Sequence, residues 1–137
     1  MYRLAVDLGT SNTVAVVADP GGGPRPLLFD GREQLPSAVH AGPAGALTAG
    51  RDAERLSRAD PAAFEPHPKR RIDDGVLLLG AHEVAVPDAL ASLLSAVLAE
   101  VRAAAFTGPG GPAATADIAA PGDPRLAGDV PEGGVPL

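Results

Sequence analysis

The residues best suited to chemistry lie near the amino terminus, where the string Asp-Leu-Gly-Thr-Ser-Asn-Thr occupies residues 7–13. An aspartate that ends a β-rich segment and is followed at once by a tight turn places a carboxylate beside a row of backbone N–H groups. Such amides bind anions without cationic side chains, and Gly9 allows close approach because it has no Cβ atom. We therefore expect a phosphate-binding turn, with Asp7 holding a hydrated Mg²⁺ ion. The hydroxyls expected to be further donors are those of Thr10, Ser11 and Thr13.

The same string also has a purely structural interpretation. Asp and Asn side chains commonly bond the amides of a hairpin turn, and the spacing of residues 7–13 by itself favours neither interpretation. The two best-known phosphate loops, Gly-x-x-x-x-Gly-Lys-Ser/Thr and Gly-x-Gly-x-x-Gly, do not occur in the sequence. A phosphate site here would be of a third kind.

The composition excludes several classes of protein. The 137 residues carry a formal net charge of −6 and include no cysteine, so disulfide scaffolds, thiolate metal sites and cysteine nucleophiles are excluded. Nucleic acid is not an expected partner, because phosphate contacts need a concentrated basic face. The spacing of His40, His67 and His82 does not suggest a metal site. No stretch is apolar enough to span a membrane and no signal peptide is visible, so we expect a cytoplasmic protein without a membrane partner.

The elements that must position the turn are short. Two β-rich segments, residues 3–8 and 13–18, flank residues 9–12 and predict a hairpin. A short helix is expected at residues 50–56, and a Gly/Ala/Pro loop is expected before it. Further extended segments are expected at residues 26–29, 35–40, 76–79 and 83–86.

The clearest helix is expected at residues 88–105. Pro87 precedes it, Asp88 stands at the predicted N-cap, and large apolar residues recur at helical spacing. This stripe consists of Leu90, Leu93, Leu94, Val97, Leu98 and Val101. Residues 107–137 are rich in Gly and Pro and contain few large apolar residues, so we expect a disordered or truncated tail after an ordered unit of residues 1–106.

Residues 7–13 resemble the first phosphate motif of the actin-like ATPase superfamily, specifically that of the heat shock protein 70 (DnaK-type) chaperones. Other segments resemble later landmarks of that family, in the family's order, over roughly residues 3–106. These are Leu35-Pro36-Ser37-Ala38-Val39 for its "TPS" strand, Gly50-Arg51-Asp52-Ala53 for its "G-x-x-A" helix start, Asp60-Pro61 for its "NP" turn, Pro68-Lys69-Arg70-Arg71-Ile72 for its "K-R-x-I/L" segment and Val86-Pro87 for the entry to its next helix. The resemblance implies an α/β fold, namely a partial actin-like (ribonuclease H-like) lobe with an amino-terminal β-meander and a following amphipathic helix.

The resemblance also implies roles for individual residues. The amides of residues 9–12 would grip the β- and γ-phosphates of ATP, Asp7 would bind hydrated Mg²⁺, and Lys69 would reach the γ-phosphate and the attacking water as the catalytic residue. The implied nucleotide-binding residues are Gly9, Thr10, Ser11, Asn12 and Thr13. The implied partners are ATP and ADP and, for the full-length family, unfolded polypeptide clients and co-chaperones. Without the resemblance, Lys69-Arg70-Arg71 is interpreted as a solvated basic run, and His67 as an exposed residue without a role.

The sequence also departs from the family pattern. The second phosphate motif, the catalytic carboxylates, the adenosine-binding motif and the peptide-binding domain of the family have no counterpart here. The family's next core strand would fall at residues 115–122, where an aspartate, a glycine and a proline disfavour a central strand. We therefore expect a truncated or frame-shifted amino-terminal piece of a chaperone ATPase domain, with weak nucleotide affinity and no turnover alone.

Three other functions stay open. An actin-like filament protein of the MreB kind has a similar opening motif, a "P-S-V-V" strand and a "D-G-V" string like Asp74-Gly75-Val76. Lys69-Arg70 and Val86-Pro87 nevertheless favour the chaperone. A sugar or carboxylate kinase of the same superfamily would need a substrate-binding aspartate that the sequence does not reveal. A non-catalytic interaction module would not respond to nucleotide.

Overall fold

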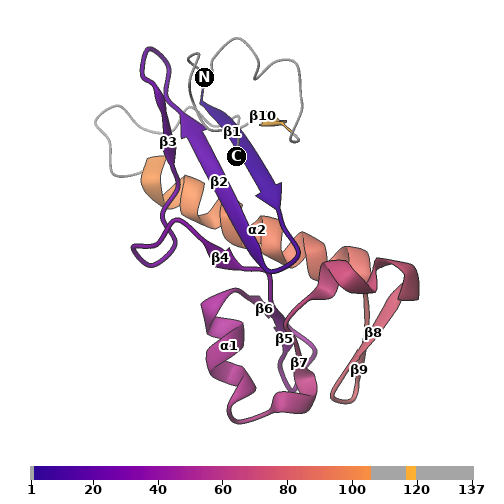
Figure 1. The fold of residues 1–137 in the computed structure, drawn as a ribbon. Helices are drawn as coiled ribbons and strands as arrows, with labels where there is room; N and C mark the ends of the chain where they lie inside the picture. The colour runs from indigo at the N-terminus through magenta and orange to yellow at the C-terminus, as the bar shows by residue number, and fades with distance from the viewer. Residues whose placement is uncertain (1, 106–116, 120–137) are drawn as a thin grey trace.

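The largest sheet has five strands and contains the expected amino-terminal hairpin (Figure 1). Its strands are β1 (Arg3–Leu8), β2 (Asn12–Ala18), β3 (Pro24–Pro26), β4 (Leu35–Pro36) and β10 (Asp117–Ala119). The order is β10-β1-β2-β3, with β10 parallel to β1, and β4 pairs with the first residues of β2. The computed structural model describes residues 2–105 and 117–119 of the chain.

The hairpin strands form because buried and less buried residues alternate along them. Leu4 and Val6 of β1 are buried, whereas Ala5 and Asp7 are half-buried. Successive side chains of a strand point to opposite faces, so Asp7 lies on the face away from the core, opposite Val14 of β2. The expected hairpin is confirmed, with its second strand beginning at Asn12.

Two smaller sheets and two α-helices complete the mixed α/β fold, and this class was expected. The strands are β5 (Val39–Ala41), β6 (Leu47–Ala49) and β7 (Phe64–Glu65), in the order β6-β5-β7, and the hairpin of β8 (Val76–Leu79) with β9 (His82–Ala85). The helices are α1 (Arg51–Ser57) and α2 (Val86–Ala105), and the 3₁₀ segments are η1 (Pro61–Ala63) and η2 (Pro68–Asp74). Within the described residues, no helix has the length and apolar character needed to cross a bilayer.

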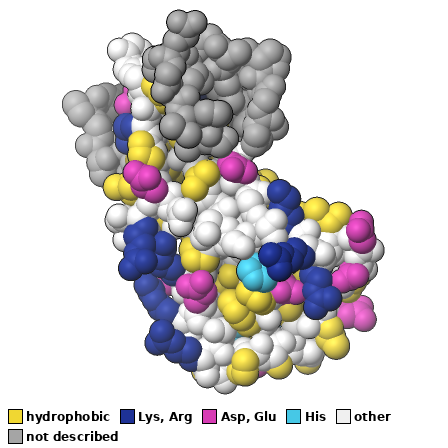
Figure 2. Space-filling view, viewed as in Figure 1, with side chains coloured by type: hydrophobic (Ala, Val, Ile, Leu, Met, Phe, Trp, Pro, Cys, Tyr) yellow, Lys and Arg dark blue, Asp and Glu magenta, His cyan; other side chains and the backbone are white. Residues whose placement is uncertain are grey.

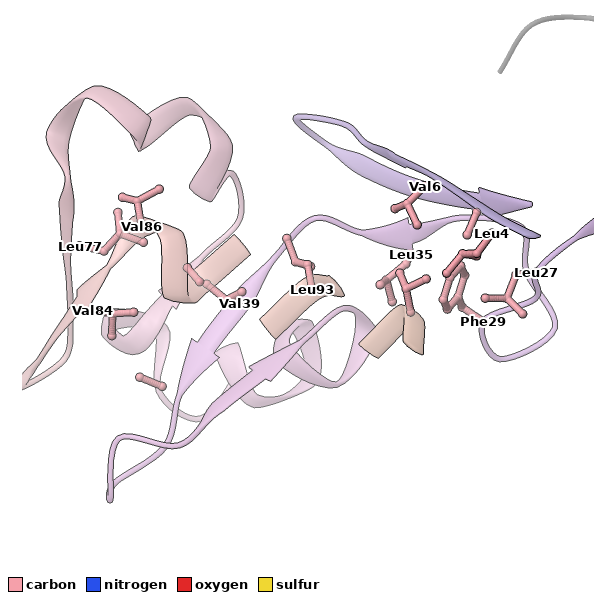
Figure 3. Close-up of a cluster of buried hydrophobic side chains, with 14 of the residues drawn as sticks. Leu4, Val6, Leu27, Phe29, Leu35, Val39, Leu77, Val84, Val86 and Leu93 are labelled. Atoms are coloured by element: carbon pink, nitrogen blue, oxygen red, sulfur yellow. The ribbon is translucent and has the colours of Figure 1, made fainter. Parts of the chain in front are cut away.

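Helix α2 connects the parts of one hydrophobic core. It passes behind the β1–β2 hairpin, and its amino-terminal end meets β9 and η2 (Figure 1). Leu93 of this helix is fully buried, and Figure 3 shows it between Val39 on one side and Leu35 with Val6 on the other. The helix therefore fixes the hairpin relative to the elements that carry Lys69.

The third strand lies at Pro24–Pro26 and not at residues 26–29, so the expected boundary was wrong. This strand is at a sheet edge, where the N–H that proline lacks is not needed by a further strand. Leu27 and Phe29, which suggested a strand, are buried in the core. Leu27 also donates its N–H to the carbonyl oxygen of Ala15 in β2 at 2.9 Å, and Phe29 forms an isolated bridge with Arg32, so both residues pair locally just beyond β3.

Three other boundaries differ from expectation. Leu47–Ala49 form β6 in a segment expected to be a loop, because Gly45, with φ +84°, allows a tight turn back onto β5. His82 lies in β9 and not in the preceding turn. Helix α2 begins at Val86, so Asp88 lies in its first turn and is not the N-cap. The strand leads directly into the helix because Val86 is itself buried in the core.

Of the carboxy-terminal segment 107–137, the structure describes residues 117–119. Residues 106–116 and 120–137 lie outside the described residues, so the expected disorder of residues 107–137 stays a prediction there. Asp117–Ala119 form β10 beside β1, although the sequence disfavoured a central strand at this point. A three-residue edge strand is less affected by nearby Gly and Pro than a central strand would be.

Candidate functional site

The β1–β2 turn comprises residues 9–12, of which Asn12 is already the first residue of β2. A Cβ atom at Gly9 would clash with the carbonyl oxygen of Asn12. The chain can therefore close this tightly only with glycine at that position. Gly9 and Thr10 are half-buried, whereas Ser11 and Asn12 are exposed, so the tip of the turn is open to a ligand.

Two side chains from the segment before and within η2 reach the turn. The ammonium Nζ of Lys69 donates to the carbonyl oxygen of Leu8 at 2.7 Å. The ring Nδ1 of His67 lies 3.3 Å from the carbonyl oxygen of Thr10. A carbonyl oxygen only accepts, so the imidazole donates from Nδ1–H in this contact. The structure thus brings Lys69 to the turn, and it gives His67 a contact that the sequence interpretation missed.

Ser37, between β4 and β5, also holds the turn. Its hydroxyl donates to the carbonyl oxygen of Gly9 at 2.7 Å, and its backbone N–H donates to the carbonyl oxygen of Ser11 at 2.9 Å. Ser37 is fully buried, so solvent does not compete for either bond. Ser37 belongs to a segment that resembles a family motif, but the sequence did not predict its contact with the turn.

The four successive carbonyl groups of residues 8–11 are therefore all bonded to other parts of the protein. In a trans peptide unit the N–H points opposite to the C=O, and the described residues contain no cis peptide bond. Within the described part of the chain, the N–H groups of Gly9, Thr10 and Ser11 have no hydrogen-bond acceptor. These amides point away from the groups that hold the carbonyls and are available to an anion.

Thr13 differs from the other residues expected to bind phosphate. It is fully buried, and its hydroxyl lies 2.9 Å from the hydroxyl of Ser37. Because Ser37 uses its single hydroxyl proton on the carbonyl of Gly9, Thr13 donates its own proton to Ser37. The structure places Thr13 beneath the turn as a support for Ser37, and not beside the more accessible hydroxyls of Thr10 and Ser11.

Asp7 stands at the end of β1 on the face opposite Val6. Its side chain is half-buried and has no ion pair or hydrogen bond among the described residues, so the carboxylate is available to a cation. The described residues contain no group of three or more His, Cys, Asp or Glu that could hold a metal ion. A single carboxylate fits an ion that keeps most of its water and shares the phosphates of a nucleotide.

A carboxylate fixes the segment that carries His67 and Lys69. Oε2 of Glu65 accepts the backbone N–H of His67 at 3.0 Å, and Oε1 accepts Nε of Arg71 at 3.0 Å. Arg71 also donates to Asp74 at 3.1 Å. The hydrogen bonds to Glu65 and then Asp74 raise the pKa of Arg71 above its ordinary range. Both carboxylates therefore favour the charged form of Arg71.

The surface around this segment is basic although the whole chain is acidic. The 3₁₀ segment η2 supplies Lys69, Arg70 and Arg71, and Figure 2 shows Lys and Arg side chains gathered around a histidine on this face. Lys69 is the one lysine in a sequence that otherwise uses arginine. An ammonium is a compact charge with three donors, whereas guanidinium is a planar fork. This position therefore differs chemically from every other basic position of the chain.

A separate hollow lies away from the turn. It has a volume of about 420 Å³ and lies between the carboxy-terminal end of β2 and β3, lined by Arg3 and residues 18–24. It contains none of the residues expected to bind nucleotide, so the β1–β2 turn is the candidate site.

No protein-family model matches the sequence, and no curated protein matches it either.

Proposed function

We propose that this chain is an ATP-binding part of a chaperone of the heat shock protein 70 type, and that the β1–β2 turn grips the nucleotide phosphates. The observation that carries the proposal is the arrangement of residues 8–11. Their four carbonyl groups are bonded elsewhere, while the amides of Gly9, Thr10 and Ser11 have no acceptor among residues 2–105 and 117–119. A row of such amides is a binding site for phosphate oxygens.

Lys69 supplies the positive charge that the turn itself lacks. Lys69 is exposed on a long, flexible side chain, so its ammonium can exchange the bond to Leu8 for a phosphate oxygen on the amide side of the turn. Phosphoryl transfer depends mainly on positioning and on neutralising charge. The role proposed for Lys69 is to bind the γ-phosphate and to orient the water that attacks it.

Asp7 is the residue proposed to hold Mg²⁺. Its carboxylate is half-buried and has no partner in the part of the chain that the structure describes, which suits a hydrated ion. When bound, the ion would neutralise charge on the β- and γ-phosphates. Asp7 itself would fix the position of those phosphates relative to the turn.

The arrangement of strands supports the actin-like ATPase part of the proposal, which the chaperone and the filament protein have in common. The family resemblance expects its next core strand near residues 115–122, and Asp117–Ala119 run parallel to β1. The amphipathic helix α2 precedes this strand in the chain, as the resemblance expects. The segment that resembles the "TPS" strand forms β4 and the start of β5, and its Ser37 bonds the turn directly.

Calorimetric titration of the full chain with Mg-ATP tests the proposal. We expect saturable binding that weakens about tenfold to a hundredfold in both variants, because Lys69→Ala removes a cation next to the phosphates and Asp7→Asn removes the carboxylate proposed to hold Mg²⁺. Arg70→Ala is the matched control, since it removes an exposed cation from the same segment. No binding by the unaltered chain, or equal weakening by all three variants, would overturn the site.

Sedimentation separates the chaperone from the filament alternative. Actin-like filament proteins polymerise with nucleotide, so the alternative predicts that Mg-ATP moves the chain into the pellet. The chaperone proposal predicts that the chain stays in the supernatant. Pelleting that depends on Mg-ATP and is lost in Asp7→Asn would favour the filament protein.

A further inference from the structure

We propose that His67 is a positioning residue that polarises the peptide unit between Thr10 and Ser11, and so makes the N–H of Ser11 a stronger phosphate donor as the pH falls. This inference rests on the proposed function of the β1–β2 turn. His67 Nδ1 lies 3.3 Å from the carbonyl oxygen of Thr10. The N–H at the other end of that peptide unit belongs to Ser11, which is exposed at the tip of the turn.

The backbone around His67 keeps the imidazole in place. Pro66 and Pro68 flank it, and proline fixes its own φ and restricts the residue before it. Pro68 is fully buried, and Glu65 accepts the N–H of His67 at 3.0 Å. The ring is therefore presented to the turn by a restrained segment, so its contact with Thr10 does not depend on a mobile loop.

The expected strengthening of the Ser11 N–H as a donor follows from two hydrogen bonds that share one peptide unit. Hydrogen bonds that share a peptide unit polarise one another, and a bond from a charged donor is about twice as strong as a neutral one. Histidine is the side chain that ordinarily changes charge between about pH 5 and 8. A protonated His67 would pull more strongly on the Thr10 carbonyl and so polarise the Ser11 N–H at the other end of that peptide unit.

Other charged groups surround this histidine and contribute to the local field. Glu65 of β7 contacts its backbone, Lys69 and Arg71 belong to η2, and Asp7 is the penultimate residue of β1. Arg71 is itself paired with Glu65 at 3.0 Å, which balances the one carboxylate that contacts His67. The pH dependence must therefore be measured against a variant that changes only the imidazole.

His67→Gln is that variant, because glutamine can still donate to the Thr10 carbonyl but carries no charge. His82→Gln is the matched control, since His82 also contacts a backbone carbonyl, that of Pro43 at 3.0 Å, but lies in β9. The readout is the amide proton shift of Ser11 in the ¹⁵N-labelled full chain between pH 8 and 5.5. We expect a titration in the unaltered chain and in His82→Gln, and none in His67→Gln. A Ser11 amide that does not titrate, or that titrates equally in all three, would overturn the inference.

The second readout is the dissociation constant for Mg-ATP of the unaltered chain and of His67→Gln at each pH. Protonation of ATP affects both proteins equally, so it cancels in the ratio. We expect the advantage of the unaltered chain to grow about fivefold from pH 8 to 5.5. A constant ratio overturns the role of His67 in phosphate binding while the proposed function stands. A Ser11 titration without any Mg-ATP binding supports the polarisation and overturns the proposed function.

Discussion

The ammonium of Lys69 donates to the carbonyl oxygen of Leu8 at 2.7 Å, across 61 positions of the sequence. This bond joins the end of β1 to η2, two elements that no hairpin or helix connects directly. It places the one lysine of the chain at the peptide unit whose N–H belongs to Gly9. The bond thus holds a cation at the first peptide unit of the turn, on its carbonyl side, before any ligand binds.

The single lysine offers a direct chemical test of nucleotide contact. An amine-reactive acyl reagent should modify Lys69 and the amino terminus, because these are the two primary amines of the chain. We predict that Mg-ATP slows modification of Lys69 severalfold and leaves the amino terminus unaffected, since only Lys69 would be covered by phosphate. Peptide mass spectrometry measures both rates in one sample. Equal rates at both amines with and without Mg-ATP would contradict the assignment.

Gly9→Ala should disrupt the turn. The added Cβ would clash with the carbonyl oxygen of Asn12, so the backbone must shift. We predict a loss of about 1–3 kcal/mol in the free energy of unfolding together with loss of Mg-ATP binding. Gly23→Ala is the control, because a Cβ there meets nothing within 4 Å. Urea denaturation and calorimetry measure the two effects, and a Gly9→Ala chain that binds normally would show that this tight geometry is not needed.

Ser37 and Thr13 should behave as a coupled pair. Ser37→Ala removes the donor to Gly9 and the acceptor for Thr13, and we predict a loss of about 1–3 kcal/mol because both groups are buried. Thr13→Val removes only the donor to Ser37. A double-mutant cycle in urea should give a coupling energy of at least about 0.5 kcal/mol, whereas additive losses would show that the buried hydroxyls do not act together.

Helix α2 should hold the two parts of the hydrophobic core together. Leu93 is fully buried between the two parts of the core, so Leu93→Ala should cost about 2–5 kcal/mol of unfolding free energy. Leu78→Ala is the matched control, because the same truncation affects a side chain that is 71% exposed. Thermal or urea unfolding measures both variants. Similar losses in the two would mean that α2 does not hold the sheets together as described.

The strands of the first hairpin and the helix α2 could be predicted because their apolar residues repeat with a clear period. The strand β6 and the bounds of β3 could not, since three residues give too short a pattern and since the buried residues Leu27 and Phe29 lie just beyond β3. Similarly, the strand β10 was disfavoured by its own composition. Its place depends on β1, a partner more than a hundred residues away in the sequence.

The β1–β2 turn of the candidate site could be predicted from the sequence, whereas most of the residues that contact the turn could not. The string at residues 7–13 identifies the amides and Asp7 from sequence alone, whereas Lys69 was suggested only by a family resemblance. The contacts of Ser37 and His67 depend on how β4, β5 and η2 fold back onto the turn. No local spacing encodes such contacts, and flanking prolines are the one local sign that His67 is held in place.

Amide chemical shifts during a titration with Mg-ATP test the central claim most directly. In the ¹⁵N-labelled full chain, we predict that the amide signals of Gly9, Thr10, Ser11 and Asn12 move together and saturate at one dissociation constant. The same titration of Lys69→Ala should move these signals with a weaker constant. A saturating titration that shifts other signals but leaves these four amides unchanged would contradict the account.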